Sequence, residues 1–388
     1  MSDFCPIQKK CNSCQLSNLS DLEQLRYKEK KCRRLIGGLC TVKPITPSPK
    51  TVGYRNKAQF VFRKNGKAGL LSGVYRSTDR SAALTPACAL CTDFANAVTA
   101  ALCKLFHSFK ITPYDPYRGT GWLKSVVIRE ATATGESMLI INGATPIFPA
   151  KHSFTTALQK ACPTLTTAVI CENRSEQKLF TGKPVLTLFG DGHITDILCE
   201  KRFLISPTSF YQINRDQTEN LYQKAIKLMA LTGSETVLDA YCGAGTIGIV
   251  AADHAKDVLS VELNPAAIRD AKQNAKLNHT ENITFINADS KDYAKALVSD
   301  GKTVDAAFID PPRAGCTASF LKALARLQPQ KIVYISCNPE TQARDILQLG
   351  RLGYRAEVCY PFDMFPHTNH CESVCRLIRS DINPLRDL

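Results

Sequence analysis

The sequence predicts an α/β protein in which residues 201–388 form a doubly wound parallel sheet. From about residue 200 onward, short apolar runs typical of buried parallel strands alternate with helical segments. One of these runs, Thr236–Asp239, is followed by the glycine-containing turn Cys242–Gly248, a combination that lets a backbone approach a ligand closely. Upstream, from Trp122 to about Cys199, strand-like runs are separated by Gly and Asn, which predicts a small antiparallel β domain within a β-rich region of residues 46–200.

The composition favours a polyanionic partner. The 388 residues are enough for two or three domains, and 49 Lys and Arg against 35 Asp and Glu give a formal charge of +14, so nucleic acid is the first partner to expect. The sequence has no run of about 18 apolar residues that could span a membrane, and Met1–Lys10 lacks the apolar core of a signal peptide. Seventeen cysteines in such a chain indicate a reducing compartment, the cytoplasm, where thiols serve metal binding or catalysis.

Three cysteines near the N-terminus have a spacing that suits metal or cluster ligation. Cys5, Cys11 and Cys14 form C-x5-C-x2-C, and a second C-x2-C pair follows at Cys88 and Cys91. Four thiolates can hold an iron–sulfur cluster or a tetrahedral zinc ion. Two C-x2-C pairs would suit zinc, but the long interval between them is unusual for a zinc ribbon. Three ligands from one loop and a fourth from a distance favour a cluster, and incidental thiols are the remaining interpretation.

Two further segments have features that suit RNA. Within residues 1–45, Leu22–Leu39 is predicted as a basic amphipathic helix ended by two glycines, either a solvated surface helix or one that contacts phosphates. The stretch Gly53–Phe62 sets cationic and polar side chains opposite an aromatic face, as in a strand that binds RNA or an ordinary exposed strand. Other predicted strands of the β-rich domain are Ser125–Ile128, Met138–Asn142, Ala168–Cys171 and Val185–Phe189.

The glycine-containing turn belongs to a predicted nucleoside site. The sequence has no Walker-type lysine, so a P-loop is excluded. The next strand ends at Glu262, where a carboxylate can accept both ribose hydroxyls of an adenosine cofactor, and Asp289 follows the strand after it, where it could contact adenine. A NAD site would share this early pattern. The combination of D-x-x-C-G-x-G with a later D-P-P favours S-adenosylmethionine.

A thiol at the end of another predicted strand suggests the chemistry. Ile332–Ile335 is a buried run, and Cys337 follows it, at the strand end where ligands of open α/β sheets bind; a packing cysteine is the alternative. A thiolate that adds to C6 of uracil makes C5 nucleophilic toward a methyl group. The adduct must then lose its C5 proton to a base, for which we predict Glu372, with His367 or His370 as alternatives.

Five stretches resemble the RNA uracil-C5 methyltransferases: FYQIN at Phe210–Asn214, DAYCGAGT at Asp239–Thr246, DPPR at Asp310–Arg313, SCNP at Ser336–Pro339 and FPHTNHCE at Phe365–Glu372. The resemblance implies a Rossmann-like methyltransferase domain that uses S-adenosyl-L-methionine, a central RNA-binding domain and an N-terminal [4Fe-4S] segment. It makes Cys337 the nucleophile and Glu372 the base. The cofactor contacts that it implies are Gln212, Tyr241, Glu262 and Asp310. The implied cluster ligands are Cys5, Cys11, Cys14 and Cys88, with Cys91 as a substitute for Cys88.

Many members of this family begin with an extra RNA-binding barrel, the TRAM domain, whereas this sequence begins at the cluster cysteines. In this respect, and in Gly53–Phe62 and Phe362–Phe365, it is most similar to the short RlmC branch, which acts on 23S rRNA. We therefore expect a cytoplasmic monomer that methylates a uridine of the uracil-747 class in 23S rRNA, or alternatively another rRNA position or tRNA. One departure is Cys371, where the family usually has an apolar residue.

Two other classes of protein share some of these features. Radical enzymes that combine a cluster with S-adenosylmethionine use C-x3-C-x2-C, which this sequence lacks. A non-catalytic RNA-binding protein would not need Cys337, Glu372 and Asp310, all of which are present.

Overall fold

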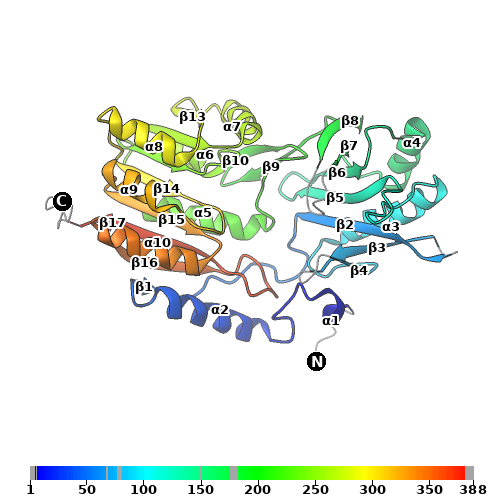
Figure 1. Cartoon of the computed structure of the whole chain (residues 1–388), viewed down its shortest axis with the longest axis horizontal. Helices are drawn as coiled ribbons and strands as arrows, with labels where there is room; N and C mark the ends of the chain where they lie inside the picture. Colours follow the sequence, from blue (N-terminus) through cyan, green and yellow to red (C-terminus); the bar gives the residue numbers. More distant parts are fainter. Residues whose placement is uncertain are drawn as a thin grey trace. The chain divides into compact units, whose positions relative to one another are not determined.

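The computed structural model describes residues 5, 7–66, 69–76, 81–148, 150–174 and 182–380. The chain divides into two compact units (Figure 1). The first unit contains the chain up to Asn18, Lys50–Ile197 and Leu204–Arg215. The second contains Leu19–Pro49, Leu198–Phe203 and the chain from Asp216 onward. Each unit has its own sheet and is described by itself.

These units do not follow the expected segments 1–45, 46–200 and 201–388. The basic helix, α2 (Asp21–Ile36), belongs to the second unit, because it packs on α10 (Pro339–Arg351) and β16 (Tyr354–Phe362). The short strand β1 (Thr41–Val42) that follows it pairs in parallel with β16. A capping box between Ser20 and Glu23 begins α2, and Gly37 caps its end, so the predicted helix Leu22–Leu39 is confirmed, with its start one residue earlier and its end three residues earlier.

The second unit contains an eight-stranded sheet in the order β1-β16-β17-β15-β14-β11-β12-β13 (Figure 1). Strands β11 to β15 are parallel to their neighbours in that group, as the alternating pattern predicted. The last strand differs: β17 lies between β15 and β16 and is antiparallel to both, so the sheet is mixed and not wholly parallel. The remaining strands are β11 (Thr236–Ala240), β12 (Asp257–Glu262), β13 (Ile283–Asn287), β14 (Ala306–Ile309), β15 (Lys331–Ser336) and β17 (Glu372–Arg379).

Helices cover this sheet, and its central strands are apolar. The run Ile332–Ile335 in β15 is at most 1% exposed, which confirms the predicted buried strand. Leu238 of β11, Ile309 of β14 and Leu377 of β17 belong to the same core cluster. The helices are α5 (Arg215–Met229), α6 (Thr246–Ala252), α7 (Pro265–Leu277), α8 (Ser290–Ser299), α9 (Ala318–Arg326), and α2 and α10 given above.

The first unit contains a seven-stranded sheet in the order β4-β3-β2-β5-β6-β7-β8. It is antiparallel as predicted, except that β6 and β7 are parallel because α4 (Lys151–Ala161) connects them. The core under α3 (Asp93–Ser108) and α4 includes Phe62, Phe106 and Phe154, whose rings are in contact. The strands are β2 (Lys57–Lys64), β3 (Leu70–Tyr75), β4 (Ala82–Leu84), β5 (Leu123–Ala131), β6 (Glu136–Gly143), β7 (Thr167–Glu172) and β8 (Lys183–Phe189).

Three short elements complete the described part of the chain. The helix α1 (Gln8–Cys11) lies among the N-terminal cysteines, and β9 (Ile194–Leu198) pairs with β10 (Lys201–Ile205) in a separate two-stranded sheet. Among the described residues, no helix has the length and apolar character needed to cross a membrane.

Candidate active site

The strand directions of the second unit bring the predicted catalytic residues to one edge of its sheet. Parallel strands end at the same edge, so the residues at and just after the ends of β11, β12, β14 and β15 lie along it. These residues include Tyr241, Glu262, Asp310 and Cys337. Because β17 is antiparallel to β15, its first residue, Glu372, lies at this edge as well. The order β14-β11-β12 also places a topological switch point here, which is where ligands of open α/β sheets bind.

Cys337 and Glu372 are neighbours across two strands. Ser336, the last residue of β15, is paired with Ser373 in β17. Cys337 follows Ser336 and Glu372 precedes Ser373, so the two residues continue the register at the end of the ladder. Side chains at opposed positions of an antiparallel pair have Cβ atoms about 5 Å apart. Cys337 is partly exposed, whereas Glu372 is 4% exposed.

Hydrogen bonds fix the turn after Cys337. The Asn338 N–H donates to Ser336 Oγ at 3.0 Å, and the Asn338 side chain accepts from the Glu340 N–H at 3.2 Å, which begins α10 with Pro339 in its first turn. The amide of Asn338 also donates to the carbonyl of Arg313 at 3.2 Å. The SCNP turn is therefore tied to the DPPR loop.

Charges at this edge act on one another. Burial raises the pKa of Glu372 to about 8, with a further contribution from the charge of Asp310. Burial likewise raises the pKa of Asp310 to about 7, and the neighbouring Asp239 adds to it. For Cys337, burial and then the charge of Glu372 raise the thiol pKa to about 11, whereas Arg313 acts in the opposite direction. Both carboxyl groups therefore titrate near neutral pH, where a base can exchange protons with a carbon acid.

Arg313 is a member of the site whose role the sequence did not reveal. Its guanidinium donates a hydrogen bond to the Cys337 thiol and lowers the thiol pKa. One of its nitrogens lies 2.9 Å from Nδ1 of His370. The only signal in the sequence was the arginine that follows the two prolines of the DPPR motif. Thr341 Oγ1 also donates to the Arg313 carbonyl at 3.2 Å, so the position of Arg313 is set by α10 as well.

The glycine-containing turn holds Glu262. The Gly243 N–H donates to one Glu262 oxygen at 3.2 Å, and the Asn264 N–H donates to the other at 2.8 Å. A side chain at Gly248 would bring Cβ within 2.5 Å of the buried Asp239 carboxylate, so only glycine fits there. Tyr241 has a positive φ of 65° and its ring packs on Phe320 with the ring centroids 5.3 Å apart. The predicted ribose acceptor is thus fixed by backbone groups.

Asp289 has a structural role in addition to any contact with adenine. It is the N-cap of α8, and its Oδ1 accepts from the Lys291 N–H at 2.8 Å. Burial raises the pKa of Tyr241, and the negative charge of the Asp289 carboxylate adds to this rise. Asp289 therefore lies near the cofactor-binding candidates of the second unit.

The loop before Glu372 is held by the inner face of α2, which sequence reasoning missed. Lys28 is fully buried; its Nζ lies 2.5 Å from Asp363 Oδ1 and 2.9 Å from the Phe365 carbonyl oxygen. Gln24 hydrogen-bonds His367 twice, to the backbone N–H at 2.7 Å and to Nδ1 at 3.1 Å. His367 is thereby part of the loop's framework. A signal existed in the spacing, since Gln24, Lys28, Cys32 and Ile36 recur every four residues and all are buried.

Cys371, the departure from the family pattern, is also part of this framework. Its sulfur lies 3.5 Å from that of Cys32 in α2, and both residues are buried. The neighbouring Cys32 thiol and burial raise the pKa of Cys371, so Cys371 is a packing residue beside Glu372.

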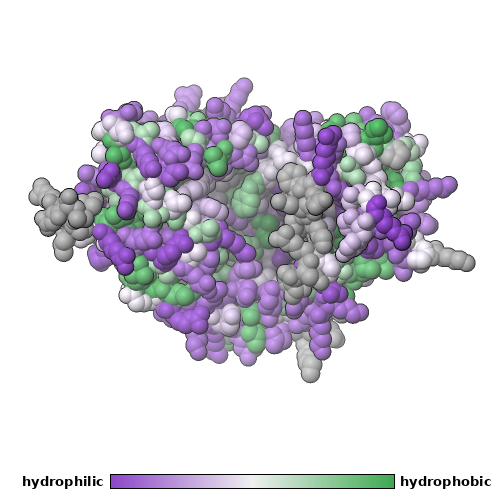
Figure 2. Space-filling view, in the orientation of Figure 1, coloured by the Kyte–Doolittle hydropathy of each residue, from purple (hydrophilic) through white to green (hydrophobic). Residues whose placement is uncertain are grey.

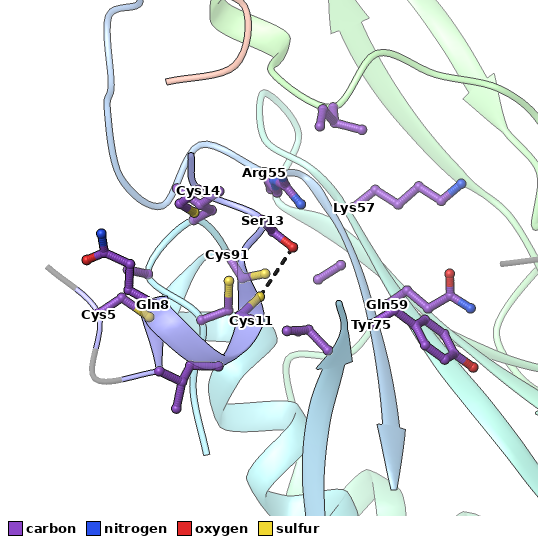
Figure 3. Close-up of a pocket in the computed structure, with 17 residues that line it drawn as sticks. Cys5, Gln8, Cys11, Ser13, Cys14, Arg55, Lys57, Gln59, Tyr75 and Cys91 are labelled. Atoms are coloured by element: carbon purple, nitrogen blue, oxygen red, sulfur yellow. Dashed lines mark hydrogen bonds between the residues drawn. The ribbon is translucent and has the colours of Figure 1, made fainter. Parts of the chain in front are cut away.

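The predicted cluster cysteines gather at one cavity of the first unit. Five cysteines line this cavity of about 270 Å³ (Figure 3): Cys5, Cys11, Cys14, Cys88 and Cys91. Cys11 Sγ donates to Ser13 Oγ at 3.2 Å, and Arg55 also lines the cavity. Among the described residues, however, no group of three or more Cys, His, Asp or Glu side chains is arranged to hold a metal ion. The cavity has the right donor type, and the [4Fe-4S] prediction is not confirmed.

Gln212 belongs to the first unit, whereas the other cofactor-binding candidates belong to the second. Its carbonyl oxygen accepts a hydrogen bond from the Asn56 side chain at 2.9 Å, which anchors the FYQIN segment beside β2. Its predicted contact with the cofactor stays a prediction.

The fold and the acidic strand ends define a class of protein, and comparison with known proteins identifies the family. The second unit has the α/β fold of S-adenosylmethionine-dependent methyltransferases. A structure of the Pyrococcus abyssi tRNA (uracil-54, C5)-methyltransferase in complex with S-adenosyl-L-homocysteine is similar over 94% of this chain and 85% of that one, with a TM-score of 0.80 and 30% identity. The family model described as tRNA (Uracil-5-)-methyltransferase matches residues 197–380.

Full-length relatives support the same identification. An RNA methyltransferase of Halalkalibacterium halodurans, described as uncharacterized, is 36% identical over 379 residues, which cover 96% of this chain and 82% of the relative. One of Clostridium acetobutylicum with the same description is 37% identical over 391 residues, covering 97% and 83%. The chain belongs to the RNA uracil-C5 methyltransferase family.

Proposed function

We propose that this protein transfers a methyl group from S-adenosylmethionine to C5 of a uridine in 23S rRNA, with Cys337 as nucleophile and Glu372 as base. The observation that carries the proposal is the register pair Ser336–Ser373, which sets the thiol and the carboxyl group side by side. The reaction requires these two groups at the same pyrimidine ring, one to form a bond to C6 and the other to remove the proton on C5.

The reaction balances with these residues. The Cys337 thiolate, favoured by the adjacent Arg313 guanidinium, forms a bond to C6, and the electron pair of the C5–C6 double bond becomes available at C5. S-Adenosylmethionine would supply the electrophilic methyl group: C5 would bond to the methyl carbon as the methyl–sulfonium bond breaks, with S-adenosylhomocysteine as the leaving group. Glu372 as carboxylate then removes the C5 proton, the double bond re-forms, and the C6–S bond breaks to return the thiolate. A uridine within folded RNA must leave its base stack to reach Cys337, because both faces of the ring are used.

Four residues would hold the cofactor. The Glu262 carboxylate, oriented by the N–H groups of Gly243 and Asn264, suits the ribose hydroxyls. Tyr241 and Asp310 follow β11 and β14, the strands at the switch point. Gln212 is the fourth residue, proposed from the family resemblance.

For the substrate we propose 23S rRNA, as in the RlmC branch, on the basis of Gly53–Phe62 and Phe362–Phe365. Another rRNA position or tRNA is the alternative, and the family model and the Pyrococcus abyssi enzyme, both named for tRNA, favour that alternative. The test is mass mapping of 5-methyluridine in rRNA and tRNA from cells with and without the gene. Loss of one 23S rRNA methylation supports the proposal, loss confined to tRNA supports the alternative, and no loss contradicts both.

We further propose that Cys5, Cys11, Cys14 and Cys88 bind a [4Fe-4S] cluster. The support is that these thiols line one cavity together with Arg55, whose positive charge would balance the negative charge of an anionic cluster. Iron and acid-labile sulfide are measured in anaerobically purified protein, with Cys88→Ser and Cys91→Ser compared. Loss of iron in Cys88→Ser alone supports the assignment. Loss of iron in Cys91→Ser alone would show that Cys91, and not Cys88, is the fourth ligand. An iron-free wild-type protein contradicts the proposal.

We also propose that the enzyme acts as a monomer in the cytoplasm. All seventeen cysteines are free thiols, which fits a reducing compartment. Light scattering of the purified protein tests the oligomeric state, and a mass near twice 42.7 kDa would contradict a monomer.

A further inference from the structure

The outer face of α2 carries a row of positive charges. Four exposed cations recur along the helix at intervals of four, three and one residues, which places them on one side of it: Arg26, Lys30, Arg33 and Arg34. Its acidic residues at exposed positions, Asp21 and Glu23, are in the first turn. Figure 2 shows mainly hydrophilic atoms over α2 along the lower edge of the view. We call these four cations the α2 outer face.

Most of this charge is not neutralised within the described part of the chain. Arg33 forms an exposed ion pair with Glu29 at 2.9 Å. Among the described residues, neither Lys30 nor Arg34 forms an ion pair with a carboxylate. Exposed ion pairs of this kind are worth little, so even Arg33 can exchange Glu29 for another anion. The row is therefore available to an anionic partner.

The helix that carries the row is anchored to segments next to the proposed catalytic residues. The inner face of α2 is bound to the loop before Glu372 through the buried ion pair of Lys28 with Asp363. On a flank of the helix, Lys31 Nζ lies 3.9 Å from Glu340, three residues after Cys337. Both contacts are made with segments adjacent to the proposed catalytic residues. A polymer that delivers a base to Cys337 would extend past this helix.

We propose that the α2 outer face binds phosphates of the RNA strand that flanks the target uridine. This inference rests on the proposed function and names the place where its substrate is held. Cations one turn apart on a helix are about 5–6 Å apart at Cβ, and long flexible side chains can each reach a phosphate along a single strand. Because the inner face of α2 is already fixed, RNA binding there needs no ordering of the helix.

The chemistry of the face favours RNA over a membrane surface. A helix that lies on a membrane needs an apolar face turned toward the lipid. The apolar face of α2 is buried in the second unit, and its exposed large side chains are Leu22, 56% exposed, and Tyr27, 46% exposed. Tyr27 lies beside Arg26, where its ring could stack on an unpaired base.

The test compares two triple variants with the same loss of charge. In the first, Arg26→Gln, Lys30→Gln and Arg34→Gln neutralise three of the four cations of the α2 outer face. In the control, Arg269→Gln, Lys272→Gln and Lys276→Gln neutralise three exposed cations of α7 in the same unit. The binding of a 23S rRNA fragment is measured at several salt concentrations, together with S-adenosylmethionine affinity and steady-state methylation.

We expect the α2 variant to lose affinity about tenfold or more near physiological salt, and the slope of log affinity against log salt to become shallower by about 2, which is about 0.7 for each of three lost phosphate contacts. KM for RNA rises with kcat and cofactor affinity nearly unchanged, and the α7 control behaves as wild type. Equal effects in both variants, or none in the α2 variant, would overturn the inference. So would charge-dependent binding to phosphatidylserine vesicles without any effect on RNA.

The binding titration is independent of methyl transfer. If the wild-type protein binds RNA through the α2 outer face but does not methylate uracil, the proposed function fails and this inference stands. If it methylates uracil and the α2 variant has wild-type affinity and KM, the inference fails alone.

Discussion

Cys337 and Glu372 meet at the end of the β15–β17 ladder, one residue beyond the paired Ser336 and Ser373. The antiparallel insertion of β17 between β15 and β16 is what brings them together. In a wholly parallel sheet, the residue that begins the last strand would lie at the opposite edge from the residue that ends β15. The proposed nucleophile and base therefore depend on one strand direction.

The first prediction concerns the nucleophile. We expect Cys337→Ala to abolish methylation, because Cys337 supplies the thiolate that forms the bond to C6. S-Adenosylmethionine affinity, measured by calorimetry, should be preserved, since Cys337 is not among the cofactor-binding candidates. Cys162→Ala is a suitable control, because this buried cysteine at the end of α4 belongs to the core of the first unit, which contains neither Cys337 nor Glu372. Normal turnover by Cys337→Ala would remove the nucleophile from the proposal.

The second prediction concerns the base. Glu372→Gln should slow turnover by a factor of about 10²–10⁴, because C5-proton removal loses its acceptor. Bond formation by Cys337 still occurs, so a covalent protein–RNA adduct should accumulate and shift on a denaturing gel. The double variant Cys337→Ala with Glu372→Gln must show no adduct. A Glu372→Gln protein that releases C5 tritium at the wild-type rate would show that another group is the base.

The third prediction follows from the raised pKa of Glu372, about 8. Only the carboxylate can accept a proton, so tritium release should rise with pH through about 8. Stability should change in the opposite direction. Between the ordinary pKa of 4.5 and about 8, the folded protein holds a proton that the unfolded chain has lost, so this group lowers stability as pH rises through that window. A tritium-release rate independent of pH between about 6 and 9 would contradict the assignment.

The fourth prediction concerns Arg313, whose charge and hydrogen bond lower the Cys337 pKa. In Arg313→Gln the thiol pKa should rise above about 11, and the thiolate fraction at a given pH should fall several-fold. Alkylation of Cys337 by iodoacetamide, followed by peptide mass spectrometry because the chain has seventeen cysteines, measures this fraction. Arg351→Gln, at an exposed position in α10, is the control. Unchanged or faster alkylation in Arg313→Gln would show that Arg313 does not support the thiolate.

The sequence predicted the parts of the site that are encoded locally. Ile332–Ile335 is a buried strand because its side chains are apolar, and Pro339 makes the chain turn after Cys337 whatever its surroundings are. The pairing of Ser336 with Ser373 is different, since it depends on a strand that returns from a distant segment, and no local pattern specifies its direction. The family motifs named Cys337 and Glu372 together, but only the register explains why they meet.

Lys28 shows the same limit for packing. A lysine in a helix with many cations is expected in solvent, because burial of an unpaired ammonium group is costly. Its burial is tolerable only with Asp363 and the Phe365 carbonyl as partners, and these lie more than three hundred residues away in the sequence. The division into units also depends on a contact between distant parts of the sequence, because β1, which follows α2, pairs with β16.

The last prediction tests that buried pair. Lys28→Met leaves the Asp363 carboxylate buried beside a neutral side chain, so it should destabilise the protein by about 3–5 kcal/mol. In the double variant Lys28→Met with Asp363→Leu neither charge is buried, so much of the lost stability should be recovered. Urea unfolding of the two single variants and the double variant measures this recovery as a coupling energy. The exposed Lys30→Met is the matched control and should change stability by less than about 0.5 kcal/mol. Because the pair anchors the loop before Glu372, Lys28→Met should also slow tritium release more than it changes S-adenosylmethionine affinity. If Lys28→Met were as stable as Lys30→Met, the ion pair would not hold the loop, and the precise placement of Glu372 would need another cause.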